Sequence, residues 1–276
     1  MERFSVLMSV YKKEKGENLR ISLGSIFKQT IPPDEVVLVE DGELTPELYA
    51  VIDSFLEAYP ERIKIVKFQE NKGLWKALQE GILHCQFDLV ARMDSDDISK
   101  PHRFEEQLKT FEKYPEIAVC SAWVEEFVED TKNIISIRKL PKTHAELYRF
   151  GKRYSPVNHP VVMFRKREVI ESGNYRNYYL FEDYDLWSRM LMKGCRFYCI
   201  PESLLYYRHS PDMIKRRGGL RYALVELKFQ WNLYQIHYIG LCTLLSNIII
   251  RFPIRIIPYP LRSYVYELIR KKQNRG

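Results

Sequence analysis

The chain has 276 residues, of which 46% are hydrophobic and 29% are charged. This composition is typical of a globular protein with a sizeable core, and it excludes an intrinsically disordered chain. The net charge is +7, but residues 211–276 contain 12 Lys/Arg and 3 Asp/Glu, a balance of +9 that leaves −2 for residues 1–210. Because the positive charge is confined to the C-terminal part, we do not expect nucleic acid as a partner.

The cysteines and the first residues predict a cytoplasmic protein. The five cysteines lie in apolar surroundings and lack the paired spacing of a metal site. Cys195 and Cys199 are expected to be reduced structural thiols. The sequence MERFSVLMSVY enters a strand-like segment without a basic head or a cleavage site, so no signal peptide is expected.

The first half alternates strand-like and helix-like segments. Residues 4–11 and 35–41 are short β-branched runs, as buried parallel strands are, and residues 18–29 between them have apolar positions at helical spacing. Repeated units of this kind predict an α/β fold, with a mostly parallel sheet and helices on both faces. Ligands of such sheets bind at the carboxyl ends of the strands. The further predicted elements are helices over 46–58 and 74–84 and strands over 62–68 and 87–94.

The second half is less regular. Helix 181–194 begins with acidic residues and ends at a glycine, as helices commonly do. The other predicted elements are helices over 101–114 and 143–150 and strands over 116–127, 133–140 and 161–166.

The C-terminal part has a different character. Residues 229–250 carry no formal charge, but polar side chains such as Gln230, Asn232 and Asn247 interrupt the segment, which argues against a membrane span. Prolines are expected to end helical structure beyond this segment, where arginines are spaced among isoleucines and tyrosines. Two interpretations stand: a segment that lies on an anionic membrane surface, or a helical appendage packed on the main domain. The prolines and arginines are Pro253, Pro258, Pro260, Arg251, Arg255 and Arg262.

The segment VARMDSDD (residues 90–97) places three acids directly after a predicted strand. In extended chain Asp94 and Asp96 point to the same side, about 6.6 Å apart. Carboxylate oxygens in this arrangement suit Mg²⁺ or Mn²⁺ shared with substrate phosphates. A solvated loop is the alternative, but the position after the fourth predicted strand favours a metal site.

Several ordered segments resemble a known family. They are SVLMSVYKKE, SIFKQTIPPDEVVLVEDG, NKGLWKALQEGI, ARMDSDDISKPHRFEEQ, NHPVVMFRK and FEDYDLWSRML, and they cover about residues 3–210. The chain resembles a family 2 glycosyltransferase of the GT-A (Rossmann-like) type, and it is particularly similar to bacterial O-antigen and capsule enzymes, including β-1,3-galactosyl- and glucosyltransferases.

The resemblance implies a nucleotide-sugar site in residues 1–100. Val10 and Tyr11 would line the uracil pocket, largely through backbone contacts, and Asp41 would accept a hydrogen bond from the uracil imide. Asp41 could instead be a turn residue. Lys76 is a candidate phosphate contact, because residues 78–79 lack the arginine that the family often has near this position.

The same resemblance implies a different role for each acid of the segment. Asp94 would contact the ribose or donor sugar, and Asp96 would bind the Mn²⁺ or Mg²⁺ that bridges the diphosphate. Asp97 could instead cap the next helix or hold the loop. His209 is a candidate further metal ligand, since neutral imidazole is compatible with Mn²⁺.

The resemblance places the acceptor site in residues 101–210. Asp183 is the predicted general base, with Glu182 supporting the base or the acceptor. The alternative is that these acids and Asp185 only cap a helix. Asn158 and His159 are expected near the donor or acceptor, although a lone histidine is more often structural. A basic loop that closes over the diphosphate is a further hypothesis for Arg208, Lys215, Arg216 and Arg217.

The resulting hypothesis is an inverting, metal-dependent transferase. It moves a hexose (galactose, glucose or an N-acetylhexosamine) from a UDP-sugar to a polyprenyl-diphosphate-linked sugar at the inner face of the bacterial membrane. Residues 211–276 form a basic, aromatic helical appendage that associates with an anionic membrane surface. The alternatives are a sugar-nucleotide pyrophosphorylase, which would need a Gly-rich phosphate loop, and a non-catalytic membrane-surface protein. A homodimer is left open.

Overall fold

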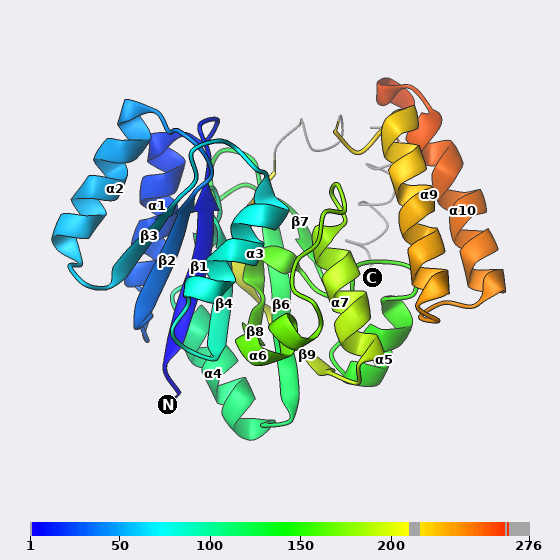
Figure 1. Cartoon of the computed structure of the whole chain (residues 1–276), viewed down its shortest axis with the longest axis horizontal. Helices are drawn as coiled ribbons and strands as arrows, with labels where there is room; N and C mark the ends of the chain where they lie inside the picture. Colours follow the sequence, from blue (N-terminus) through cyan, green and yellow to red (C-terminus); the bar gives the residue numbers. More distant parts are fainter. Residues whose placement is uncertain (1, 210–215, 263, 265–276) are drawn as a thin grey trace.

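A computed structural model describes residues 2–209, 216–262 and 264 of the chain (Figure 1). The expected contribution of Lys215 to a basic loop, and most of the chain beyond residue 262, lie outside the described residues.

The first half forms the predicted parallel β-α units. Strands β1, β2, β3 and β4 pair in parallel in the order β3-β2-β1-β4. Because every connection passes through a helix, the carboxyl ends of these strands meet at one edge of the sheet. The elements are β1 (Phe4–Val10), α1 (Gly16–Phe27), β2 (Glu35–Glu40), α2 (Pro46–Ala58), β3 (Ile63–Lys67), α3 (Leu74–His84) and β4 (Leu89–Asp94).

The second half extends the same sheet with mixed pairing. The full order is β3-β2-β1-β4-β8-β6-β9-β5, with β7 on β6, nine strands in the described part of the chain. β8 is antiparallel to β4 and β6, whereas the long β6 and β9 pair in parallel. The strands are β5 (Ile98–Ser99), β6 (Ile117–Phe127), β7 (Ile134–Arg138), β8 (Met163–Arg165) and β9 (Arg196–Arg208).

Helices cover both faces of the sheet, as predicted, and each face has its own core. In β1, Leu7 points into one core while Val6 and Met8 point into the other, which follows from the two-residue period of a strand. The face of Val6 is covered by α1, α2 and α4 (Arg103–Lys113). The face of Leu7 is covered by α3, α5 (His144–Phe150), α6 (Lys166–Glu171) and α7 (Glu182–Met192). A short 3-10 helix, His159–Val161, precedes β8.

The C-terminal appendage is a hairpin of two helices, α9 (Leu220–Gln235) and α10 (Leu241–Ile256), packed beside α7 (Figure 1). The prediction of a helical appendage is confirmed. Within the described residues, no helix has both the length and the apolar character that crossing a bilayer requires.

The expectation that Pro253 ends helical structure is wrong. α10 continues through Pro253 to Ile256. A proline removes one hydrogen bond to the preceding turn, but Pro253 lies one turn before the helix end, and the N–H of Ile257 still reaches its carbonyl oxygen at 3.1 Å. The helix ends just before Pro258, where the residue preceding a proline disfavours helical backbone.

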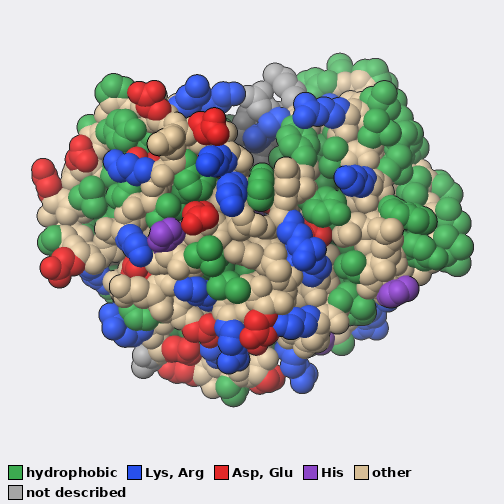
Figure 2. Space-filling view, in the orientation of Figure 1, with side chains coloured by type: hydrophobic (Ala, Val, Ile, Leu, Met, Phe, Trp, Pro, Cys, Tyr) green, Lys and Arg blue, Asp and Glu red, His purple; other side chains and the backbone are tan. Residues whose placement is uncertain are grey.

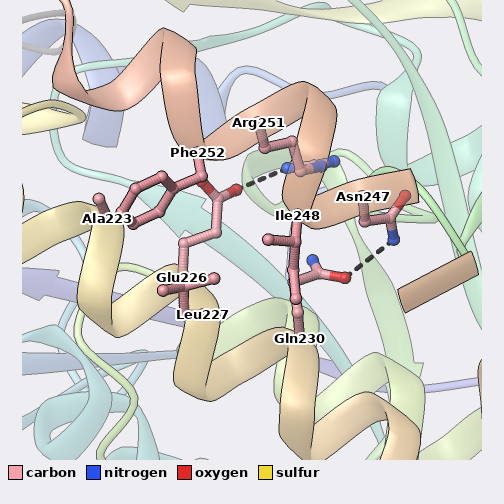
Figure 3. A pocket seen from close by; sticks show the side chains of 8 residues that line it. All are labelled: Ala223, Glu226, Leu227, Gln230, Asn247, Ile248, Arg251 and Phe252. Atoms are coloured by element: carbon pink, nitrogen blue, oxygen red, sulfur yellow. Dashed lines mark hydrogen bonds and ion pairs between the residues drawn. The ribbon is translucent and has the colours of Figure 1, made fainter. Parts of the chain in front are cut away.

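A buried ion pair network joins the two helices of the hairpin (Figure 3). Glu226 of α9 accepts a hydrogen bond from Arg251 at 2.6 Å, as Figure 3 shows. It also accepts one from Arg255 at 2.7 Å. Gln230 accepts from Asn247 at 2.8 Å, while no acceptor among the described residues reaches its buried Nε2. The pocket beside it has a volume of about 10 Å³, which is room for about one water molecule.

Aromatic contacts attach the hairpin to the domain. The fully buried Phe229 stacks on Phe181 with ring centroids 4.8 Å apart, and it packs on Tyr184 at the same separation. The side-chain amide of Asn232 donates to Asp185 of α7 at 3.2 Å. The hairpin is therefore packed firmly on the domain.

We expect Phe229→Ala to lower the free energy of unfolding by about 3–5 kcal/mol, because it removes a buried ring and leaves a cavity between α9 and α7. Urea unfolding measures the change. Leu224→Ala, at an exposed position of the same helix, is the matched control and should cost well under 1 kcal/mol. Equal effects of the two substitutions would contradict the docking of α9 through this ring.

Candidate active site

Three carboxylates gather at the carboxyl end of β4. Asp94 is the last residue of β4, and Asp96 and Asp97 lie in the turn that leads to β5. One oxygen of each lies within 4.8 Å of those of the other two. Asp94 and Asp96 are partly exposed and Asp97 is buried, so a bound group could reach the cluster from one side.

Burial and mutual repulsion raise the pKa values of two of these acids. The pKa of Asp96 rises to about 7, first through burial and then through the charges of Asp94 and Glu14. Burial, followed by the neighbouring aspartates, raises the pKa of Asp97 well above its usual value. No donor among the described residues reaches the buried Oδ2 of Asp97. A divalent cation would offset the repulsion and occupy the free oxygen, so these residues fit Mg²⁺ or Mn²⁺.

A buried arginine underlies the cluster. Both terminal nitrogens of Arg92 bind the carboxylate of Asp94, one of them at 2.6 Å from Oδ2, and Arg92 is only 2% exposed. Arg103, also buried, donates to the backbone oxygen of Arg92 at 2.6 Å. The Asp94 carboxylate is therefore fixed in orientation, and it is less available as a metal ligand than Asp96 or Asp97.

The acidic turn is held from two sides. The backbone N–H of Arg208, at the end of β9, donates to Oδ1 of Asp97 at 2.8 Å, and its Nε donates to the carbonyl oxygen of Asp96 at 2.8 Å. On the other side, the hydroxyl of Ser95 donates to Glu14 at 2.9 Å. Asp97 thus holds the loop, which was one of its two predicted roles, and it also belongs to the acidic cluster.

Asp41 organises the neighbouring loop. Its carboxylate accepts hydrogen bonds from the side chain of Asn71 at 2.9 Å and from the backbone N–H groups of Lys72 at 2.7 Å and Gly73 at 3.0 Å. The following Gly42 has φ +87°, and a Cβ there would lie 2.7 Å from the nitrogen of Asn71. Since a carboxylate has about four acceptor sites, Asp41 retains capacity for a ligand beside its turn role.

The other residues predicted to contact the nucleotide differ in how accessible they are to a ligand. The side chain of Val10 lies in the core, and its carbonyl oxygen accepts the N–H of Asp41 at 2.8 Å. Tyr11, by contrast, is exposed at the edge of the sheet. Lys76 donates to Gln79 of its own helix at 2.7 Å, and the ammonium group has further N–H donors for a phosphate.

The predicted base lies in a second acidic group at the start of α7. Asp183 approaches Nδ1 of His159 at 4.0 Å, and Nε2 of His159 lies 3.0 Å from the hydroxyl of Tyr175. Burial raises the pKa of Asp183, and burial together with Asp183 raises the pKa of Glu182 to about 7. Burial and the charge of Arg92 lower the pKa of His159 well below its usual value. A neutral histidine thus sits beside a carboxylate whose basicity is increased.

Arg92 connects the two acidic groups electrostatically. Besides binding Asp94, its charge lowers the pKa values of Glu182 and Asp183. Arg217, near the start of α9, acts on the same two acids in the same direction. The carboxyl end of β4 and the first turn of α7 are therefore close enough to influence each other electrostatically.

His209 and Asp185 make other contacts. His209 is buried just after β9 with its N–H on the carbonyl oxygen of Phe127 at 2.7 Å, and it is not a member of the three-acid group found among the described residues. Its role as a metal ligand stays a prediction. Asp185 pairs with Arg189 of its own helix at 2.9 Å and with Asn232 of α9, which makes it a structural residue.

Asn158 is structural as well. Its side-chain amide donates to the carbonyl oxygen of Ala122 at 2.8 Å, and its N–H donates to the hydroxyl of Ser121 at 3.0 Å. These bonds fix the loop that carries His159 beside Asp183.

Sequence reasoning overlooked Arg92, Glu14 and Tyr175. A signal for Arg92 was present, because it precedes Asp94 by two positions on a strand and must therefore point to the same face of the sheet. Glu14 and Tyr175 come from loops, and nothing in their local sequence marks them.

Known proteins resemble the chain in sequence and fold. The model of "Glycosyl transferase family 2" matches residues 5–173. The Escherichia coli UDP-Gal:alpha-D-GlcNAc-diphosphoundecaprenol beta-1,3-galactosyltransferase is 40% identical over 270 residues, which are 98% of this chain and 97% of that protein. The Erwinia amylovora amylovoran biosynthesis glycosyltransferase AmsE is 37% identical over 97% of this chain and 99% of its own length.

Solved structures share the fold at lower identity. S. aureus TarS 1–349 in complex with UDP-GlcNAc has a TM-score of 0.68 at 14% identity, covering 90% of this chain and 72% of that one. The mannosyltransferase PcManGT from Pyrobaculum calidifontis, in complex with GDP-Man and Mn²⁺, has a TM-score of 0.63 at 16% identity, covering 97% and 80%. Both the GT-A type of fold and the predicted family are confirmed: the chain is a glycosyltransferase that belongs to glycosyl transferase family 2.

Proposed function

We propose that the protein transfers a hexose from a UDP-sugar to a sugar carried on a polyprenyl diphosphate, with inversion at the anomeric carbon and with the help of a divalent cation. The similarity to the E. coli beta-1,3-galactosyltransferase, 40% over nearly the whole of both chains, carries this proposal and favours galactose as the hexose. Glucose and N-acetylhexosamines remain the alternatives for the donor. Membership of a transferase family argues against a pyrophosphorylase and against a non-catalytic surface protein.

Residues 1–100 are proposed to bind the nucleotide sugar. Asp41 and Tyr11 border the place where the base would lie, and Lys76 stands at the start of α3 for the phosphates. Asp96 and Asp97 would hold the cation, which supplies positive charge against the diphosphate of the departing UDP. Asp94, held by Arg92, is then free of the cation and can orient the ribose or the sugar.

Residues 101–210 are proposed to bind the acceptor. Asp183 takes the proton of the acceptor hydroxyl as its oxygen attacks the anomeric carbon, while the bond from that carbon to the diphosphate oxygen breaks and UDP leaves with the electron pair. Attack from the face opposite UDP inverts the configuration. The raised pKa of Asp183 suits this task, because a more basic carboxylate is a better proton acceptor.

A polyprenyl-linked acceptor is held in a membrane by its lipid, so the enzyme must reach it at the membrane surface. Peripheral association with the inner face of the bacterial plasma membrane, through the region 211–276, is therefore part of the proposal. Residues 211–215, 263 and 265–276 of that region lie outside the described residues.

Transfer assays test the function directly. UDP-galactose and a synthetic GlcNAc-diphosphate-lipid acceptor are expected to give a β-linked product, whose anomeric configuration NMR identifies. UDP-glucose and UDP-GlcNAc serve as competing donors. An α-linked product would contradict inversion, and absence of transfer from all three donors would contradict the proposed function.

Thermal unfolding tests the metal site. UDP together with Mn²⁺ is expected to raise the melting temperature by about 5 °C, because ligands that bind only the folded state stabilise it. Asp96→Asn should lose the part of the shift that depends on Mn²⁺, whereas Asp53→Asn, an exposed acid of α2, should keep it. A full Mn²⁺ effect in Asp96→Asn would show that the cation binds elsewhere.

The pH dependence of kcat/KM tests the base and its neighbour. Asp183 accepts a proton only when ionised, so the rate should fall as pH drops through its raised pKa. Asp183→Asn should lower kcat by about 10²–10⁴-fold and abolish this acidic limb. Arg92→Met removes a charge that lowers the pKa of Asp183, so the limb should move to higher pH, and Arg92→Lys should move it less.

Glu47→Gln changes an exposed acid in the first turn of α2 and is the control for both variants. Near-normal turnover of Asp183→Asn would rule out its role as the base. If the acidic limb of the kcat/KM profile lay at the same pH in Arg92→Met as in wild type, the electrostatic link between the two acidic groups would be ruled out.

A further inference from the structure

The outer surface of the α9–α10 hairpin is an unusual accumulation of exposed large hydrophobic side chains. Figure 2 shows them gathered over these two helices. Ile249 is 70% exposed and Leu220 is 61% exposed, and a contiguous apolar patch of this kind usually marks an interaction site. The exposed members are Leu220, Leu224 and Trp231 of α9 and Leu241, Leu245, Ile249, Ile250 and Ile256 of α10.

The hairpin does not need this surface for its own packing. Along α9, Leu220, Leu224 and Trp231 follow helical spacing and share one stripe, while Phe229 on another side of the helix is buried against the domain. Along α10, Leu245 and Ile249 are likewise one turn apart on the exposed side. Each helix therefore has one apolar stripe that is used in the fold and a second that is not.

The charges around the outer surface have one sign. Arg216, Arg217, Arg221 and Lys228 are all exposed. The one acid in residues 216–262 is Glu226, which is buried and bound by Arg251 and Arg255. The outer surface thus combines aliphatic and aromatic groups with cations, and none of its described residues offers an exposed carboxylate.

We propose that the outer face of the α9–α10 hairpin docks on an anionic lipid bilayer, with its apolar stripes among the headgroups and its cations on lipid phosphates. The composition is that of an interfacial amphipathic helix. A second copy of the chain fits less well, because face-to-face pairing would bring cations together without a carboxylate to pair them. The inference deepens the proposed function, on which it rests for the lipid nature of the acceptor.

The position of the hairpin suits this role. The N–H of Gly219 donates to the carbonyl oxygen of Arg255 at 2.8 Å, so the start of α9 and the end of α10 lie together, and Figure 1 shows them at the same end of the molecule as the carboxyl end of β1. Arg217 at this end acts electrostatically on Glu182 and Asp183. A bilayer on the outer face would therefore lie beside the acceptor side of the site.

Vesicle co-sedimentation of the full chain tests the proposal. Wild type is expected to bind vesicles of phosphatidylcholine and phosphatidylglycerol more tightly than vesicles of phosphatidylcholine alone. Leu245→Glu/Ile249→Glu should weaken binding to the mixed vesicles about tenfold or more. Leu83→Glu, an exposed leucine of α3, is the matched control and should bind as wild type does. Arg221→Gln/Lys228→Gln should lose much of the preference for the anionic lipid.

The proposal would be overturned if the double glutamate variant still bound the mixed vesicles. It would equally be overturned if wild type did not bind them. A concentration-dependent dimer in sedimentation velocity that the same variant abolishes, without vesicle binding by wild type, would assign the face to a second copy instead. An assay of sugar transfer to a short-chain, water-soluble acceptor tests the proposed activity separately from membrane docking. Vesicle binding without any transfer would refute the proposed activity alone, and transfer without vesicle binding would refute the docking alone.

Discussion

The acids of the candidate site depend on one buried group, the guanidinium of Arg92. Three carboxylates gather at the end of β4 and two more stand at the start of α7, and acids that are buried and close together repel one another and take up protons. Arg92 binds Asp94 directly, and its charge reaches Glu182 and Asp183. Its charge therefore lowers the pKa values of acids in both groups against the effect of burial, and its hydrogen bonds fix the orientation of the Asp94 carboxylate.

The fold was predictable because its signals are local. The β-branched runs and helical periodicities of residues 4–94 each specify one element, and short connections leave parallel β-α units as the arrangement. The second half was less predictable, since β8 and the two-residue β5 depend on pairing with β6 and β9, far along the chain. Pro253 was misjudged for a related reason: a proline near a helix end is tolerated when the tertiary packing of the helix is already secured.

The site was predictable where its residues follow strands and unpredictable where they depend on contacts. Asp94 and Asp96 follow a strand end, so their position at the sheet edge could be inferred from sequence. The neighbourhood of Asp183 could not, because His159 and Tyr175 come from separate parts of the chain. Asp41 and Lys76 illustrate the same limit, since the hydrogen bonds that occupy them in the folded chain are invisible in the sequence.

The hairpin and helix α7 are packed against each other. Asp183 stands in the first turn of α7, and Asp185 in the same turn is tied to Asn232 of α9. The family match ends at residue 173, whereas the E. coli galactosyltransferase and AmsE align over 97–98% of this chain, so the alignments extend over the sequence of α7 and of the hairpin. A surface that positions the hairpin against a bilayer also positions the helix that begins with the proposed base. The packing of the hairpin on α7 would thus serve two purposes: it orients Asp183, and it brings the site to an acceptor held in a membrane.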